Sequence, residues 1–119
     1  MAANERKNDW RSPCPVCRVL EILGDKWSLL VVRDLMLGRT RFKEFIASPE
    51  GIPTNILTER LNRLVEHGII EKAPVSEGSK RFAYLLTDKG KALRPVLKSI
   101  MKWGLEHEEG TRVGLSKSG

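Results

Sequence analysis

The stretch from residue 52 to residue 68, IPTNILTERLNRLVEHG, limits the possible folds of this chain more than any other. Its apolar residues recur at the spacing of one face of an α-helix. Pro53 suits the first helical turn, where a missing N–H costs no bond, and Gly68 suits the position after the last turn. The pattern predicts a helix of about four turns with one buried face. The residues predicted on that face are Leu57, Leu61, Leu64 and Val65.

The opposite face of this helix carries short polar side chains and one arginine. Such groups can hydrogen-bond the edges of base pairs in a DNA major groove. An ordinary surface helix carries a similar face, and for an isolated helix that explanation is the more frequent one. The residues that could contact bases are Thr54, Asn55, Thr58, Glu59, Asn62 and Arg63.

The length and charge of the chain indicate a single-domain protein without a membrane span, with polyanions as its favoured partners. A chain of 119 residues suits one domain with one core. No run approaches the roughly 18 apolar residues of a membrane span, and the N-terminus lacks an apolar signal segment, so no membrane association and a cytoplasmic location are expected. The net charge of +6 favours polyanionic partners. Between residues 80 and 102, seven basic residues accompany a single acid.

Three helices are predicted before the 52–68 helix. Each begins with a suitable residue: Pro15 stands early in the first, Asp25 can cap the second, and Thr40 can cap the third. The second is apolar on more than one face, which predicts a central buried helix. The three predicted helices span residues 13–24, 26–37 and 41–47, after an N-terminal arm over residues 1–12.

Two short strands are predicted after the 52–68 helix. The turn Ser-Glu-Gly-Ser at 76–79 separates runs of strand-forming residues at 69–75 and 80–86, which predicts a β-hairpin. Lys80 and Arg81 would then lie near its tip.

A last helix is predicted over residues 88–105, with Thr87 as its cap. Pro95 has no N–H for the carbonyl of Lys91, so a bend is expected there. The domain is thus expected over residues 13–105, followed by a flexible tail over 106–119.

This order of elements, mainly α with a small β-hairpin, is that of a winged helix-turn-helix. In that architecture the third helix crosses the phosphate backbone, the fourth presents its polar face to the major groove, and the hairpin lies beside it. Basic residues stand where this geometry needs phosphate contacts, and they favour double-stranded DNA as the partner. They are Arg39, Arg41 and Lys43 around the third helix, and Lys80 and Arg81 in the hairpin.

Several segments also carry a family pattern. They are CPV (14–16), GDKWSLLVVRDL (24–35), GRTRFKEF (38–45), ILTERLNRLVEHGII (56–70) and YLLTDKGKALRPVLKSIMKWG (84–104). Together they resemble the HxlR family of bacterial transcriptional regulators, over nearly the whole chain. The resemblance implies a winged-helix homodimer, joined largely through its first and last helices, that binds operator DNA.

A homodimer is also expected from the last helix itself. Its apolar stripe is larger than so small a domain can cover alone. The alternative is that the stripe packs only on the first helix of the same chain. A two-fold protein would match a pseudo-palindromic operator, which favours the dimer. The residues expected at the interface are Trp10, Val16, Leu20, Leu93, Leu97, Ile100, Met101 and Trp103.

Cys14 and Cys17 form a C-x-x-C pair at the start of the first helix. One such pair is a weak zinc signal, and no βαβ context supports a thioredoxin-like enzyme, so neither a metal nor another cofactor is expected. A thiol at a helix N-terminus beside Arg11 and Arg18 has its thiolate favoured. Several members of the family that this chain resembles use the cysteine matching Cys14 as a redox or electrophile switch. The alternative for both cysteines is a small buried hydrophobe.

Three functions therefore remain open. The favoured one is a sequence-specific DNA-binding transcriptional regulator, responsive to a small oxidant or electrophile through Cys14. The others are a thiol–disulfide active protein using Cys14 and Cys17, and a winged helix that docks RNA or protein. No nucleophile–base pair with an orienting group is present in the sequence, so there are no candidate catalytic residues and a non-enzyme is expected.

Overall fold

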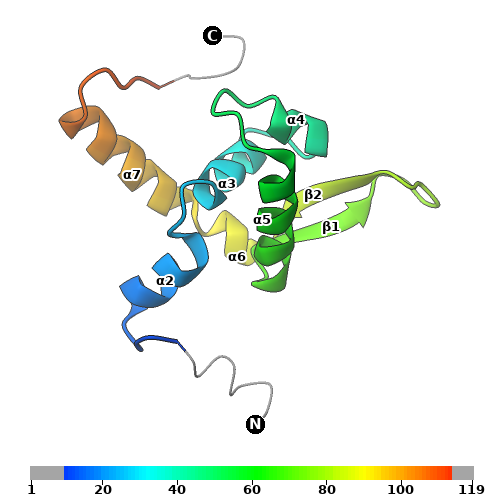
Figure 1. Cartoon of the computed structure of the whole chain (residues 1–119), viewed down its shortest axis with the longest axis horizontal. Helices are drawn as coiled ribbons and strands as arrows, with labels where there is room; N and C mark the ends of the chain where they lie inside the picture. Colours follow the sequence, from blue (N-terminus) through cyan, green and yellow to red (C-terminus); the bar gives the residue numbers. More distant parts are fainter. Residues whose placement is uncertain (1–9, 114–119) are drawn as a thin grey trace.

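The computed structural model describes residues 10–113, and residues 1–9 of the predicted arm and 114–119 of the predicted tail lie outside them. The elements follow the order of a winged helix-turn-helix, as predicted (Figure 1). No helix in the described part of the chain is long and apolar enough to cross a membrane. The elements are α2 (Pro15–Leu23), α3 (Ser28–Met36), α4 (Phe42–Ile46), α5 (Thr54–Glu66), β1 (Ile70–Pro74), β2 (Phe82–Leu86), α6 (Asp88–Lys91) and α7 (Arg94–His107).

The core forms where α3, α4, α5 and the hairpin meet. The three leucines of α5 are completely buried, as their spacing predicts. Val65 is 38% exposed, so its predicted burial is wrong, because it lies at the edge of the leucine stripe. The largest fully buried apolar side chains are Val32, Phe45, Leu57, Leu61, Leu64 and Ile70.

Acidic side chains begin α3 and α4. Asp25 accepts hydrogen bonds from the backbone N–H groups of Trp27 (2.9 Å) and Ser28 (3.0 Å), so it caps the chain ahead of α3 as predicted, although the helix itself begins at Ser28. The predicted cap of the next helix, Thr40, is wrong. Instead the Glu44 carboxylate reaches back and accepts from the backbone N–H groups of Thr40 and Arg41, both at 2.9 Å.

The predicted last helix is divided in two. Thr87 caps α6 as predicted, its Oγ1 accepting from the N–H of Gly90 at 3.1 Å. The helix ends at Lys91, and α7 begins at Arg94 with Pro95 in its first turn. The structure thus has a break where the sequence predicts a bend: Pro95, which cannot donate to the Lys91 carbonyl, lies in the first turn of a new helix, and Leu93 between the two helices packs against the core.

The two strands are antiparallel, with Ile70 opposite Leu86 and Pro74 opposite Phe82. Gly68 joins α5 to β1 with φ +73°, the left-handed conformation predicted for this position. The N–H of Tyr84 donates to the carbonyl of Thr40 at 2.8 Å, which ties the hairpin to the segment before α4. The hairpin therefore lies beside α4 and α5, in the place of a wing.

Candidate nucleic-acid interface

The exposed face of α5 gathers most of the side chains predicted to contact bases. The backbone of Pro53 is extended, so the helix begins at Thr54 and presents its first turn to solvent. The Thr58 hydroxyl donates to the Thr54 carbonyl at 3.0 Å, which leaves its methyl group and an oxygen lone pair available. The exposed members of the predicted set are Thr54, Asn55, Thr58, Glu59 and Asn62.

Arg63 lies on the flank of this face, in one surface hollow with Glu59 and Asn62, and is held by the body of the domain, so its base contact stays a prediction. Its Nη2 donates to Oδ1 of Asp25 at 2.7 Å and to the Ser28 hydroxyl at 3.3 Å. Burial acts to raise the pKa of Asp25, but hydrogen bonds from Ser28, Arg60 and two backbone N–H groups outweigh it and hold the pKa well below its ordinary value. Arg63 is therefore drawn to a charged carboxylate on the turn between α2 and α3.

Arg39, for which a phosphate contact is predicted, is also drawn inward. Its Nη1 lies 3.3 Å from Oδ1 of Asp34, and only 13% of its side chain is exposed. Asp34 is buried, and it also accepts hydrogen bonds from Arg33 and from the Ser48 hydroxyl. A buried carboxylate is costly unless it is paired, so Arg39 and Arg33 neutralise it.

Three other predicted phosphate contacts come together in one cleft. Arg41 and Lys43, at the start of α4, line it with Arg81, which precedes β2; its volume is about 550 Å³. Within residues 10–113 these three cations, and Lys80, which precedes Arg81 in the sequence, form no ion pair with another described residue. The cleft, whose lining also includes Glu44, therefore gathers positive charge between α4 and the hairpin.

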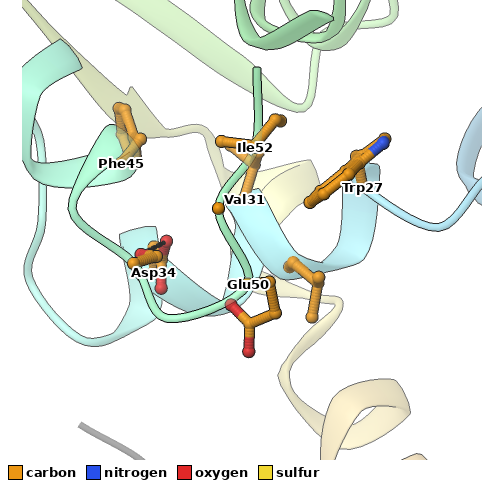
Figure 2. A pocket seen from close by; sticks show the side chains of 9 residues that line it. Trp27, Val31, Asp34, Phe45, Glu50 and Ile52 are labelled. Atoms are coloured by element: carbon orange, nitrogen blue, oxygen red, sulfur yellow. Dashed lines mark hydrogen bonds between the residues drawn. The ribbon is translucent and has the colours of Figure 1, made fainter. Parts of the chain in front are cut away.

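A small cavity lies behind the α4–α5 turn. Figure 2 shows its walls, which come from Trp27 and α3, from Phe45 of α4, and from Glu50 and Ile52 ahead of α5. Its volume is about 10 Å³, room for about one water molecule and not for an organic effector. Arg33 donates twice to Glu50, at 2.8 Å each, and this pairing is the chief reason that the pKa of Glu50 is lowered.

The two cysteines are free thiols at the start of α2. Cys14 lies at the helix start, as predicted, in the N-cap position; it is exposed, which contradicts the alternative of a buried hydrophobe, and Cys17 is half-buried. The arginines predicted beside Cys14 have other partners. Arg11 pairs with Glu21, which is the main reason that its pKa is raised, and Cys17 adds to this effect. Arg18 donates through Nε to the Ser12 carbonyl at 3.1 Å.

The residues predicted at a dimer interface separate into two groups. Leu93 and Leu97 are half-buried against the core of their own chain. Trp10 also packs within the chain, with its ring centroid 6.2 Å from that of His67. The exposed group is Val16 and Leu20 on α2, and Ile100, Met101 and Trp103 on α7.

Sequence reasoning missed two residues that shape this surface, Asp25 as an ion-pair partner and Arg60. The Nε of Arg60 donates to Oδ2 of Asp25 at 2.8 Å, beside the bond from Arg63. The spacing of three between the two arginines was a usable signal, because it places both on one flank of a helix. The sequence distance to Asp25, 35 residues from Arg60, concealed their partner.

Comparisons with known proteins agree with this architecture and confirm the family resemblance. Residues 22–111 match the HxlR-like helix-turn-helix family. The HTH-type transcriptional regulator YvaP of Bacillus subtilis (strain 168) is 38% identical over 89 residues, which cover 75% of this chain and 82% of YvaP.

Solved structures of regulators share the fold. PA1607, a candidate transcription factor, superposes with a TM-score of 0.79 at 43% identity, over 91% of this chain and 77% of PA1607. The reduced form of the transcriptional regulator YodB from B. subtilis superposes with a TM-score of 0.69 at 31% identity, over 85% of this chain and all of YodB. YodB is also known in diamide-treated and quinone-bound forms. The chain therefore belongs to the HxlR-like helix-turn-helix family of transcriptional regulators.

Proposed function

We propose that two copies of this chain bind a pseudo-palindromic operator in double-stranded DNA, with each α5 in a major groove. The observation that carries this proposal is the row of exposed polar side chains on α5, together with the cleft between α4 and the hairpin that Arg41, Lys43 and Arg81 line. Phosphate contacts hold a protein in register on the duplex, while hydrogen bonds to base edges select the sequence. The cleft and Lys80 supply the first kind of contact, and α5 supplies the second.

The dimer is proposed from uncovered apolar surface. Val16 on α2 is 66% exposed and Trp103 on α7 is 60% exposed, and each belongs to a row of exposed apolar side chains. Large exposed apolar patches mark interaction sites. A second copy covers these rows by symmetry and provides the second half-site contact that a palindrome requires.

A binding experiment tests the DNA proposal. A motif is first selected from random duplexes with the full-length protein, and its affinity is compared with those of a scrambled duplex and of an RNA of the same sequence. Asn55→Ala is expected to lower discrimination between motif and scrambled DNA by about 1–3 kcal/mol. Glu109→Gln, at an exposed position after the end of α7, is the control and should leave this discrimination unchanged. Equal binding of RNA, or equal discrimination by Asn55→Ala, would contradict the proposal.

Cys14 is proposed as a regulatory thiol. It is exposed at a helix N-terminus and adjoins the apolar face of α2, so a group added there would alter the proposed dimer contact. A quinone would react by addition: the Cys14 S–H bond breaks, the sulfur bonds to a ring carbon, and the thiol proton and the proton of that carbon end on the two quinone oxygens, which leaves a hydroquinone joined to the sulfur. Diamide would take two electrons and two protons from two thiols, which join as a disulfide.

Operator binding before and after treatment with a quinone or diamide tests this part. Wild type is expected to lose affinity, Cys14→Ser to keep it, and Cys17→Ser to respond to the quinone as wild type does. Loss of binding in treated Cys14→Ser would move the sensitive group elsewhere. Unchanged binding in treated wild type would leave both cysteines structural.

A further inference from the structure

The exposed side of α5 carries a stripe of four polar side chains without a basic member. Asn55, Glu59, Asn62 and Glu66 follow one another at i, i+4, i+7 and i+11, opposite the buried leucines of the helix. All four are exposed. A helix that lies in a major groove with its leucines inward would present the N-terminal part of this stripe, Asn55, Glu59 and Asn62, to the base edges, with Glu66 beyond them in the last turn.

The arginines of α5 lie on its flank and are held by Asp25. The Nε of Arg60 and the Nη2 of Arg63 each donate to a different oxygen of that carboxylate, at 2.8 and 2.7 Å. Their side chains are only 20% and 26% exposed. Asp25 itself accepts hydrogen bonds from the backbone N–H groups of Trp27 and Ser28 at the start of α3, which fix its position. To turn its guanidinium edge toward a guanine, either arginine would have to release a charged, partly buried hydrogen bond to Asp25, which disfavours a two-pronged contact.

We propose that α5 recognises its half-site without an arginine–guanine contact, using Asn55 and Asn62 at adenines and Glu59 at a cytosine. This inference rests on the proposed function, since it requires α5 in the major groove. Arg60 and Arg63 are positioning residues, which set the orientation of α5 through Asp25.

The donor and acceptor pattern of each side chain determines this preference. An asparagine amide donates to N7 of adenine and accepts from its N6 amino group, while a carboxylate accepts from the N4 amino group of cytosine. Guanine and thymine turn acceptor oxygens toward the groove, and these repel a carboxylate. Glu59 therefore disfavours guanine and thymine, and of the two bases that carry an amino group it prefers cytosine, because adenine also presents its N7 acceptor beside the amino group.

Arg60 makes a carboxylate tolerable on a DNA-facing surface. Phosphates repel an isolated negative charge, which would weaken binding to every sequence. The Nη1 of Arg60 donates to Glu59 while its Nε holds Asp25, so one guanidinium offsets the charge of Glu59 and orients it. The Glu59 side chain remains 54% exposed, with acceptor sites left for a base.

The test is a selection of bound duplexes from a random library by wild type, Glu59→Gln and Glu66→Gln. A glutamine amide suits adenine, so Glu59→Gln is expected to change the preferred base at one position per half-site from cytosine to adenine. Its affinity for the wild-type operator should fall roughly 5- to 150-fold. Glu66→Gln removes the same charge from the last turn of the same stripe, away from the N-terminal part that contacts bases, and should leave the motif unchanged.

Arg63→Gln separates positioning from base contact. The inference predicts a lower melting temperature for this variant but the same preferred motif. A guanine position that disappears in Arg63→Gln, or a motif that survives Glu59→Gln unaltered, would overturn the inference while leaving DNA binding intact. If folded wild-type protein selects no motif at all, the proposed function itself fails. Glu59 is exposed, so circular dichroism of Glu59→Gln should match wild type and the result stays interpretable.

Discussion

The helices α5 and α7 are both amphipathic and have nearly the same length, 13 and 14 residues, yet they differ in what covers them. Three leucines of α5 are completely buried, because α3, α4 and β1 surround that face. No residue of α7 is buried. Only its first turns reach the core, through the half-buried Leu97 and the preceding Leu93, and the rest extends away from α3 (Figure 1). An apolar stripe thus indicates that one face of a helix packs against other apolar groups. It does not indicate whether those groups belong to the same chain or to a partner.

The difference has an energetic consequence. An isolated helix of about 14 residues is only marginally stable in water, and most helical stability in proteins comes from packing of the apolar face. The core of this chain supplies that packing to α5. For most of α7, the proposed second copy would supply it. The two helices are therefore expected to respond differently to mutation and to protein concentration.

The largest effect is expected from Leu61→Ala in α5. Removing a completely buried leucine leaves a cavity and should lower the free energy of unfolding by about 2–5 kcal/mol. Urea denaturation measures this loss, which should be the same at low and high protein concentration. Val65→Ala, at an exposed position on the same helix, is the control and should cost much less. Equal losses for the two variants would contradict the assignment of the covered face.

Trp103→Ala in α7 is the matching change on the uncovered helix. An aromatic anchor at the centre of an interface contributes about 2 kcal/mol or more, so the dimer dissociation constant should rise by about 30-fold or more. Sedimentation over a range of concentrations measures this change, with Val75→Ala, at an exposed apolar position in the hairpin turn, as the control. A wild-type monomer of 13.5 kDa that binds a palindrome tightly would exclude the dimer.

Changes in the wing should affect DNA binding without affecting either helix. Lys80→Ala and Arg81→Ala are expected to weaken binding to all duplexes alike and to reduce the slope of log affinity against log salt by about 0.9 for each phosphate that the protein no longer neutralises. Lys98→Ala, an exposed cation on α7, is the control and should keep the slope. A change of preferred sequence in the wing variants would instead place base recognition in the wing.

The smallest effect is expected from His67, which packs beside Trp10 at the end of α5. Burial is the chief reason that the pKa of His67 lies below its ordinary value of 6.5. The unfolded chain therefore binds more protons just below pH 6.5, and stability should decrease slightly as the pH falls through that value. Melting temperatures at about pH 7.5 and pH 5.5 measure the decrease, which should shrink in His67→Asn. A larger decrease in that variant would assign the pH dependence to other groups.

Much of the fold could be predicted because its signals are local. The leucine spacing of α5, the glycine after it and the Thr87 cap each depend on neighbours within one or two helical turns, and all three are confirmed. Pro95 shows where local reasoning ends. The sequence predicts that Pro95 cannot donate a helical hydrogen bond. A bent helix and a broken helix are both compatible with that missing bond, so the sequence does not choose between them. The break at Lys91 was decided by tertiary packing, since Leu93, between the two helices, packs against the core.

For the candidate interface too, some features follow from the sequence and others only from the tertiary structure. The sequence by itself determined which side chains carry positive charge and which face of α5 is polar. It did not determine which cations remain available to DNA. Arg41 lines an open cleft, whereas Arg39, two residues earlier, is paired with buried Asp34, and Arg63 is paired with Asp25, 38 residues away. Ion pairing depends on distance in space, and only the packing of α3, α5 and the turn before α3 brings those carboxylates within reach.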